Sequence, residues 1–295
     1  MHNKIQEYSS LIEEQLYKYF ENSLPQYKIL FESMEYSVKN GGKRVRPLLT
    51  LLFYNACGKE DVLKAMPMAE AVEFIHTYSL IHDDLPCMDD DDFRRGKPSN
   101  HKVYGEAFAL LAGDGLLTAA FERISVWSLA GLYSDEVAVK AINELSVYAG
   151  PRGMIGGQVI DLQNENNPNA DFETLQLMDE LKTGCLISVA CALGCIAAGA
   201  DDTLIDAAKT FGTKLGLAFQ IKDDVLDVTS SLEKLGKMTG SDTENNKSTY
   251  VTLLGVEKCE ELVKQLTQEA LTALDAFPNN EVIKEYANYL QNREY

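Results

Sequence analysis

The order of apolar and polar residues along the chain predicts helices almost throughout. In residues 5–20, apolar or aromatic side chains recur every three or four positions, as in an amphipathic helix: Tyr8, Leu11, Ile12, Leu16 and Phe20. Similar patterns predict helices over 65–82, 114–132, 135–148, 201–213 and 260–276. Several of these open on an acidic residue, which suits the positive end of the helix dipole. Because no stretch alternates apolar and polar residues between turn signals, we expect an all-α fold.

The breaks in this pattern predict the loops, which we place at 39–47, 90–100, 164–171 and 229–247. One apolar segment needs separate treatment. Residues 183–200, TGCLISVACALGCIAAGA, carry no charge over 18 positions, which is close to the length of a membrane span. Their side chains are mostly small, so we interpret the segment as a buried core helix and expect no membrane span.

Length and composition favour one large domain over 1–295, because no Gly-, Ser- or Pro-rich linker divides the chain. There are 27 Lys and Arg against 45 Asp and Glu, a net charge of −18. This balance argues against nucleic-acid binding, which depends on phosphate contacts, and against a basic membrane-surface protein. The start, MHNKIQEYSS, lacks the apolar stretch of a secretory signal, and the six cysteines form no CxxC pair. We therefore expect a reduced, cytoplasmic protein.

Two clusters of aspartates are the first candidate chemistry. In HDDLPCMDDDDFRRG, Asp83 and Asp89 are six residues apart and would lie on different faces of an unbroken helix. Pro86 stands between them, so we expect the helix to loosen at 85–88 and Asp89 to turn back beside Asp83. In FQIKDDVLDV, Asp223 and Asp227 are four apart and share one helix face. Such carboxylates suit Mg²⁺ shared with a substrate phosphate, and we expect the two pairs to face each other across a cleft.

A bland interpretation stands beside this one. An acidic run is often only a solvated loop, and a single DDxxD arises by chance in acidic proteins. The run also resembles a calcium loop in composition, but it lacks the spacing of an EF-hand with its glycine at the sixth position. Two clusters in apolar helical context favour metal binding, because buried carboxylates without cations cost several kcal/mol each. Asp90, Asp91 and Asp92 are interpreted as a solvated continuation.

Basic residues form three groups that complement the acids. They are Lys43, Arg44 and Arg46 in GGKRVRP, then Arg94 and Arg95, then the scattered Lys182, Lys237 and Lys247. One arginine guanidinium can donate two hydrogen bonds to two phosphate oxygens at once, whereas lysine supplies a point charge. The first group is not a Walker loop, because no Ser or Thr follows Lys43. Any one group alone would be a solvated basic turn; together with two acidic sites they indicate phosphate chemistry.

These motifs, with GGQVIDL between them, resemble the trans-isoprenyl diphosphate synthases over roughly residues 41–255, most closely the bacterial farnesyl diphosphate synthases. The resemblance implies a single all-α bundle of the isoprenoid synthase type around a deep cavity, usually dimeric. It implies a prenyltransferase that needs about three Mg²⁺ ions, with Mn²⁺ as an alternative. Its substrates would be isopentenyl diphosphate and an allylic diphosphate, dimethylallyl or geranyl, joined by ionisation, condensation and elimination.

The resemblance also implies roles for single positions. It assigns metal binding to Asp83, Asp89, Asp223 and Asp227. The catalytic aspartates that it implies are Asp83, Asp84, Asp89, Asp223 and Asp224. It places Lys43, Arg46, His76 and Arg95 on isopentenyl diphosphate. It places Arg94, Lys182, Thr183, Gln220, Lys237 and Lys247 on the allylic diphosphate, with Arg94 and Lys182 also catalytic. Gln158 and Asp161 lie near the metals. His82 packs or orients a carboxylate, and His101 has no assigned role.

Product length is expected to depend on Tyr78 and Ser79, which lie one to two turns before Asp83, about 6–10 Å deeper along the helix. A tyrosine there would stop chain growth near farnesyl diphosphate, although Tyr78 could also be ordinary core packing. The main alternative is a geranylgeranyl diphosphate synthase with a deeper pocket. A terpene cyclase has no need of the second diphosphate site at Lys43, Arg46 and Arg95. A non-catalytic metal-binding scaffold subunit is the alternative from another class.

Overall fold

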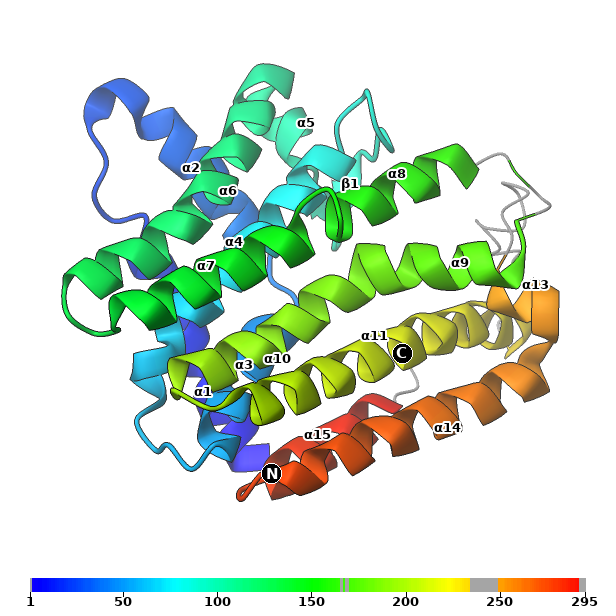
Figure 1. The fold of residues 1–295 in the computed structure, drawn as a ribbon. Helices are drawn as coiled ribbons and strands as arrows, with labels where there is room; N and C mark the ends of the chain where they lie inside the picture. Colours follow the sequence, from blue (N-terminus) through cyan, green and yellow to red (C-terminus); the bar gives the residue numbers. More distant parts are fainter. Residues whose placement is uncertain (1, 165–166, 168–169, 234–248, 292–295) are drawn as a thin grey trace.

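The computed structural model describes residues 2–164, 167, 170–233 and 249–291, and most of them are helical (Figure 1). The N-terminal half holds α1 (His2–Lys18), α2 (Lys28–Lys39), α3 (Val45–Ala56), α4 (Met66–Asp83), α5 (Asn100–Tyr104) and α6 (Glu106–Leu129). The C-terminal half holds α7 (Asp135–Ala149), α8 (Met154–Asn164), α9 (Phe172–Asp179), α10 (Cys185–Ala197), α11 (Asp202–Glu233), α13 (Tyr250–Leu254), α14 (Val256–Ala273) and α15 (Glu281–Gln291). Short 3₁₀ turns lie at Pro25–Tyr27, Val62–Ala65 and Leu274–Ala276. The all-α prediction is confirmed.

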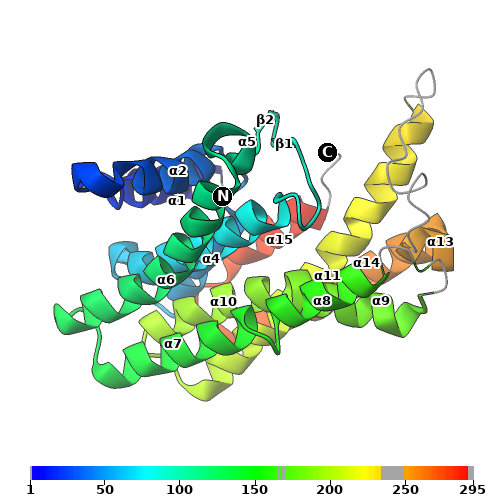
Figure 2. The same cartoon turned by 90° about the horizontal axis from the view of Figure 1, so that it is seen from above.

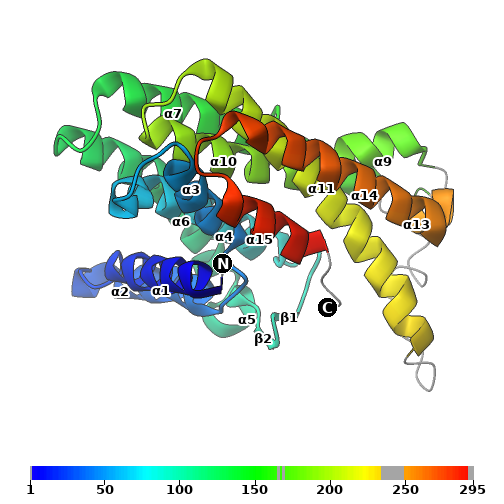
Figure 3. The same cartoon turned by 90° about the horizontal axis from the view of Figure 1, so that it is seen from below.

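Helix α10 occupies the centre of the fold, where it packs against α3, α4, α7 and α11. Figures 2 and 3 show it enclosed between the α4 and α6 side and the α11 and α14 side. Its one glycine allows this close packing: a Cβ on Gly194 would lie 2.9 Å from the backbone nitrogen of Tyr54 on α3. The hydroxyl of Thr50 donates to the carbonyl of Ala190 at 2.9 Å across the same contact.

The segment Phe172–Ala197 is long and apolar enough to cross a membrane by length and composition, but 67% of its most apolar window is buried inside the protein. Eleven residues of α10, from Leu186 to Ile196, are buried without interruption. The prediction of a buried core helix over 183–200 is therefore confirmed.

Several predicted boundaries were wrong, each for a physical reason. Helix α6 begins at Glu106 instead of 114, and α11 continues to Glu233 instead of ending near 213. The loop predicted at 39–47 is shorter, because α3 already starts at Val45. Helix α3 went unnoticed because nine of its twelve residues are buried, so it shows no amphipathic period.

Other differences concern the loops and smaller helices. The sequence pattern also missed α2, α8, α9 and α15. The loop at 90–100 contains a small antiparallel hairpin of β1 (Phe93–Arg94) and β2 (Lys97–Pro98), which no alternation of residues predicted. The loop at 229–247 was wrong up to Glu233, and its remainder lies outside the described residues.

Candidate active site

The first acidic cluster lies at the turn that ends α4. Helix α4 stops at Asp83, and the chain then folds back, so that the backbone N–H of Asp89 donates to the carbonyl of Asp83 at 2.9 Å. The N–H of Met88 donates to the carbonyl of Leu85 at 2.8 Å within the same turn. The expected return of Asp89 to Asp83 around Pro86 is thus present in the structure.

The electrostatics of Asp83 fit a cation site. Burial raises the pKa of the Asp83 carboxyl to about 6, and the charges of Asp89 and Asp84 add to this rise, while Lys182 opposes it. A divalent cation beside these carboxylates would favour their charged form and so offset both the burial and the repulsion that raise this pKa. The donor set, oxygens only, is the set that Mg²⁺ prefers.

The second acidic cluster lies on α11, as predicted. Phe219, Asp223 and Asp227 are spaced four apart on this helix, so they share a face, with Asp223 ~6 Å beyond Phe219 along the axis. Phe219 lines the first cavity described below, which directs this face toward it. That the two acidic clusters face each other across a cleft stays a prediction. Gln220, half-buried, follows Phe219 on the same helix.

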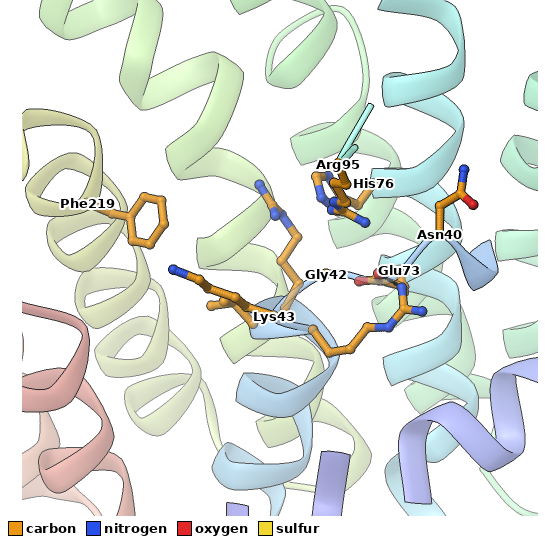
Figure 4. Close-up of a pocket in the computed structure, with 10 residues that line it drawn as sticks. Asn40, Gly42, Lys43, Glu73, His76, Arg95 and Phe219 are labelled. Atoms are coloured by element: carbon orange, nitrogen blue, oxygen red, sulfur yellow. Dashed lines mark hydrogen bonds and ion pairs between the residues drawn. The ribbon is translucent and has the colours of Figure 1, made fainter. Parts of the chain in front are cut away.

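A cationic cavity of about 580 Å³ lies beside the first cluster (Figure 4). It is lined by the residues assigned to isopentenyl diphosphate together with others: Asn40, Gly42, Lys43, Arg44, Val45, Arg46, Glu73, His76, Arg95 and Phe219. Lys43 extends toward the ring of Phe219 in this view. Burial lowers the pKa of Arg46 to about 10, which still leaves its guanidinium charged at neutral pH. Burial, and then Arg46 and Arg95, hold the pKa of His76 well below 6.5, so His76 is neutral.

Gly42 and Arg95 are in close contact in this cavity. The Arg95 guanidinium donates to the carbonyl of Gly41, and it lies where a side chain on residue 42 would stand. A Cβ on Gly42 would meet the guanidinium carbon at 2.7 Å, and the φ of Gly42 is +131°. The turn at Gly41 and Gly42 thus holds Arg95 beside Lys43 and Arg46, although about 50 residues separate Arg95 from them in sequence.

Arg44 differs from its basic neighbours. Its side chain is buried, and it donates to Glu73 on α4 at 2.7 Å and to the carbonyl of Val38 at 2.5 Å. Glu73 was not among the predicted residues, yet its charge also acts on Arg46 and Arg95. The sequence did contain one signal for Glu73: it stands three residues before His76, so the two side chains share a face of the helix.

A second cavity, of about 450 Å³, adjoins the first, since Arg46 and His76 line both. Its wall is mainly apolar and includes Leu80, Leu117, Met154, Ile155, Val159 and Leu162. Tyr78 and Ser79 lie in this wall, and Asp83, Lys182 and Thr183 line it too. The buried Tyr78 hydroxyl has no hydrogen-bond partner within the described chain. The hydroxyl of Ser79 donates to the carbonyl of His76 at 2.9 Å.

Lys182 and Thr183 are presented by a π-helical turn, Glu180–Gly184, between α9 and α10. Such turns are often found at functional sites. Lys182 donates to the buried carboxylate of Asp161 on α8 at 2.5 Å. Gly157 lets α8 approach this closely, because a Cβ there would lie 2.7 Å from the Cα of Lys182. Gln158 lines the second cavity, and its buried amide nitrogen has no partner in the parts of the chain described.

Asp84 and Arg94 are paired with each other. The Nε of Arg94 donates to Asp84 at 2.9 Å, and its Nη2 donates to Asp91 at 3.1 Å. Asp84 is buried, and neither residue is among those lining the two cavities. Asp224 is also turned aside, since it accepts from the backbone N–H of Tyr250 at 2.8 Å. Lys237 and Lys247 lie outside the described residues.

Asp179 and Tyr250 were missed by sequence reasoning. Both are buried, at the end of α9 and the start of α13. Burial, and then the charge of Asp224, raise the pKa of Asp179 to about 7. No motif marks these residues, because they come together only when α9, α11 and α13 pack.

The fold and the two adjoining cavities define an all-α protein of the isoprenoid synthase type. The family model described as polyprenyl synthetase matches residues 27–290, and the chain belongs to this family. It is 50% identical to farnesyl diphosphate synthase from Bacillus subtilis over 246 residues, 83% of this chain and 82% of that one. It is 44% identical to the chloroplastic geranylgeranyl pyrophosphate synthase of Capsicum annuum over 268 residues, 90% of this chain and 72% of that one.

Solved structures agree with this assignment. The geranyltransferase from Helicobacter pylori complexed with magnesium and isoprenyl diphosphate matches with a TM-score of 0.82 and 36% identity. That match covers 98% of this chain and 96% of the other. The predicted family and fold are both confirmed.

Proposed function

We propose that this protein is a Mg²⁺-dependent prenyltransferase that condenses isopentenyl diphosphate with dimethylallyl or geranyl diphosphate to give farnesyl diphosphate. One observation carries the proposal: a cationic cavity and an apolar cavity adjoin, with Arg46 and His76 between them. A diphosphate suits the first cavity and a hydrocarbon chain the second. The relatives named as farnesyl diphosphate synthase and geranyltransferase support the same activity.

Magnesium would be held by Asp83, Asp89, Asp223 and Asp227, about three ions by analogy with the family, with Mn²⁺ as an alternative. When bound, it would neutralise the diphosphate of the allylic substrate and stabilise its departure. The chain's own cations act with it: Lys182, fixed by Asp161, stands at the mouth of the apolar cavity beside Asp83. A fixed positive charge stabilises the leaving diphosphate without reorganisation during the reaction.

Isopentenyl diphosphate would bind in the cationic cavity through Lys43, Arg46, His76 and Arg95. Neutral His76 can donate one N–H to a phosphate oxygen without adding charge. The allylic C–O bond breaks, and the diphosphate leaves with the electron pair. The double bond of isopentenyl diphosphate then forms the new C–C bond, and a proton passes from the resulting cation to the departed diphosphate.

The further allylic-diphosphate contacts, Thr183, Gln220, Lys237 and Lys247, are part of the proposal. Asp84 and Arg94 enter it in a modified form. Since they pair with each other, we propose that Asp84 holds Arg94 until the allylic diphosphate arrives and that Arg94 then turns to it. Asp224 would position the start of α13 through Tyr250.

The length of the product is expected to depend on Tyr78. Its buried ring lies in the wall of the apolar cavity, five residues before Asp83 in the sequence. We propose that it stops growth at farnesyl diphosphate. A geranylgeranyl diphosphate synthase is the second candidate, because relatives of that name match at 44% identity. A terpene cyclase and a non-catalytic scaffold are disfavoured by the cationic cavity, which neither requires.

We further propose that the chain acts as one domain, in the cytoplasm, as a homodimer. Helix α6 exposes large apolar side chains to solvent near its start. This exposed α6 face consists of Phe108, Leu110 and Leu111. Exposed apolar side chains gathered on one helix are typical of a protein interface, and a second copy would cover them.

The test of the proposed function is a condensation assay. The purified protein is supplied with dimethylallyl and isopentenyl diphosphates, with and without Mg²⁺, and the released diphosphate and the products are measured. Mg²⁺-dependent formation of a C15 diphosphate would support it.

A further inference from the structure

A group of three side chains outside the proposed active site is the subject of this inference. Asp90 and Asp92 precede the β1–β2 hairpin, and His101 lies in α5, just after it. The hairpin closes this gap: the N–H of Ser99 donates to the carbonyl of Asp92 at 2.9 Å, and its hydroxyl to that of Asp91 at 2.5 Å. One oxygen of each carboxylate and one ring nitrogen of His101 all lie within 4.8 Å of one another.

His101 is the feature that a solvated acidic loop does not explain. Its side chain is only 6% exposed, and neither ring nitrogen has a hydrogen-bond partner among the described residues. A buried polar atom without a partner is costly, so such atoms in native proteins call for a bound group. Here the group would reach Asp90 and Asp92 as well, both of which are exposed and open to solvent ions.

The surrounding charges favour a cation at this position. The neighbouring Asp91 is engaged with Arg94, which leaves Asp90 and Asp92 for other partners. Lys102 pairs with Asp92 at 2.6 Å and is the competing cation. Its side chain is 41% exposed and flexible, so a divalent ion with three ligands can displace it.

We propose that Asp90, Asp92 and His101 form a second cation site, separate from Asp83 and Asp89, that selects a transition divalent ion such as Mn²⁺, Co²⁺ or Zn²⁺. The selection follows from the ligands. Mg²⁺ prefers oxygen ligands, whereas an imidazole nitrogen suits borderline metals. Three protein ligands leave further positions for water.

A bound ion would fasten the start of the hairpin to α5. The hairpin and its turn carry Arg94 and Arg95, and Asp89 directly precedes the site. The site would therefore restrict the loop that connects the first acidic cluster with the cationic cavity. Its residues do not line either cavity, so ion binding here can be measured without substrate.

Pulsed EPR of bound Mn²⁺ tests the site, because directly bound imidazole gives a ¹⁴N modulation that oxygen ligands do not. The full chain is loaded with one equivalent of Mn²⁺ in excess Mg²⁺. The expected result is a ¹⁴N signal that disappears in His101→Gln and persists in His2→Gln, His76→Gln, His82→Gln and Asp223→Asn. The chain has only four histidines, so these variants cover every nitrogen source of this kind.

A second measurement guards against a misfolded His101→Gln. Asp92→Asn changes an exposed residue, and we expect it to weaken Mn²⁺ binding at this site at least tenfold by titration in excess Mg²⁺. Lys102→Ala removes the competing cation and should tighten the same binding. The proposal is overturned by the absence of a ¹⁴N signal in the unmodified chain, by loss of the signal in His82→Gln or His76→Gln, or by unchanged affinity in Asp92→Asn.

Discussion

At the scale of single residues, Arg46 and His76 are the positions where the two cavities meet. Their properties depend on neighbours that are distant in sequence. Glu73 balances the cluster of arginines, and burial keeps His76 neutral among them. Arg44 belongs to the same motif as Arg46, but its ion pair with Glu73 stabilises the fold.

The Gly42–Arg95 contact gives the first prediction. Gly42→Ala would place a methyl group on the Arg95 guanidinium, so the guanidinium must shift from its position in the cationic cavity. We expect kcat/KM for isopentenyl diphosphate to fall at least tenfold. Gly41→Ala is the matched control. It carries the strain of a positive φ, +82°, worth about 1–2 kcal/mol, but its Cβ meets nothing within 4 Å. Equal loss in both variants would contradict the role given to Arg95.

Tyr78 gives the second prediction. Tyr78→Ala removes the largest side chain that faces the apolar cavity from α4, so chains longer than C15 should appear. Product lengths are measured by chromatography after incubation with excess isopentenyl diphosphate. Ser79→Ala, which deletes only a hydroxyl already bonded to its own helix, should lengthen the product less than Tyr78→Ala does. An unaltered C15 product from Tyr78→Ala would refute the assignment.

At the scale of elements, the site depends on how helices end and deviate. Helix α4 stops at Asp83 because the chain turns back before Pro86, and a π-helical turn between α9 and α10 presents Lys182 and Thr183. The start of α13 is tied to α11, because the backbone N–H of Tyr250 donates to the carboxylate of Asp224. Each of these features links a residue of a sequence motif to a helix or turn that lies outside that motif.

Asp179, where α9 meets α11 and α13, gives a pH prediction. Its folded-state pKa, about 7, is raised above the unfolded value of about 3.8. A carboxyl whose pKa is higher in the folded than in the unfolded state stabilises the fold fully below its unfolded-state pKa. This stabilisation is lost as the pH rises through the folded-state pKa. At 1.36 kcal/mol per pKa unit, we expect the metal-free protein to lose about 2–4 kcal/mol from this group between pH 4 and pH 8.

Urea denaturation at several pH values measures this effect. Asp179→Asn should have a flatter dependence of the unfolding free energy on pH, and it should gain most relative to the unmodified protein above pH 7. Asp171→Asn, at an exposed helix cap, serves as the control and should leave the slope in this range nearly unchanged. Parallel curves for Asp179→Asn and the unmodified protein would show that the carboxyl is not buried in this way.

The sequence predicted a definite part of this account. Periodicity was sufficient for α1, α7 and α14, whose apolar residues form a stripe, but it failed for α3, which is buried on nearly all sides. The return of Asp89 to Asp83 followed from Pro86 alone. The pairing of Asp84 with Arg94, the counter-charge of Glu73 and the isolated His101 could not be predicted, because each depends on side-chain directions set by tertiary packing.

At the scale of the whole molecule, the charge of −18 and the cationic cavity belong together. The acidic surface repels diphosphates at long range, so binding depends on the local group of Lys43, Arg46 and Arg95 and on metal at the acidic clusters. Around these, the described chain forms one helical assembly centred on α10.

The exposed α6 face gives a prediction at this scale. We expect the protein to sediment as a dimer of 32.7 kDa chains. Leu111→Lys, in the exposed face, should shift it toward monomer, whereas Val139→Lys, at a still more exposed apolar residue on α7, should not. A dimer unaffected by Leu111→Lys would place the interface elsewhere.

The most direct test of the central claim is the condensation of dimethylallyl and isopentenyl diphosphates, followed by chromatography of the products. The account predicts farnesyl diphosphate in the presence of Mg²⁺ and no product when Mg²⁺ is removed by a chelator. Asp83→Ala and Asp223→Ala should each lower turnover by orders of magnitude while the helical circular dichroism signal stays intact. Turnover without Mg²⁺, near-normal activity in either variant, or no condensation product under any condition would contradict it.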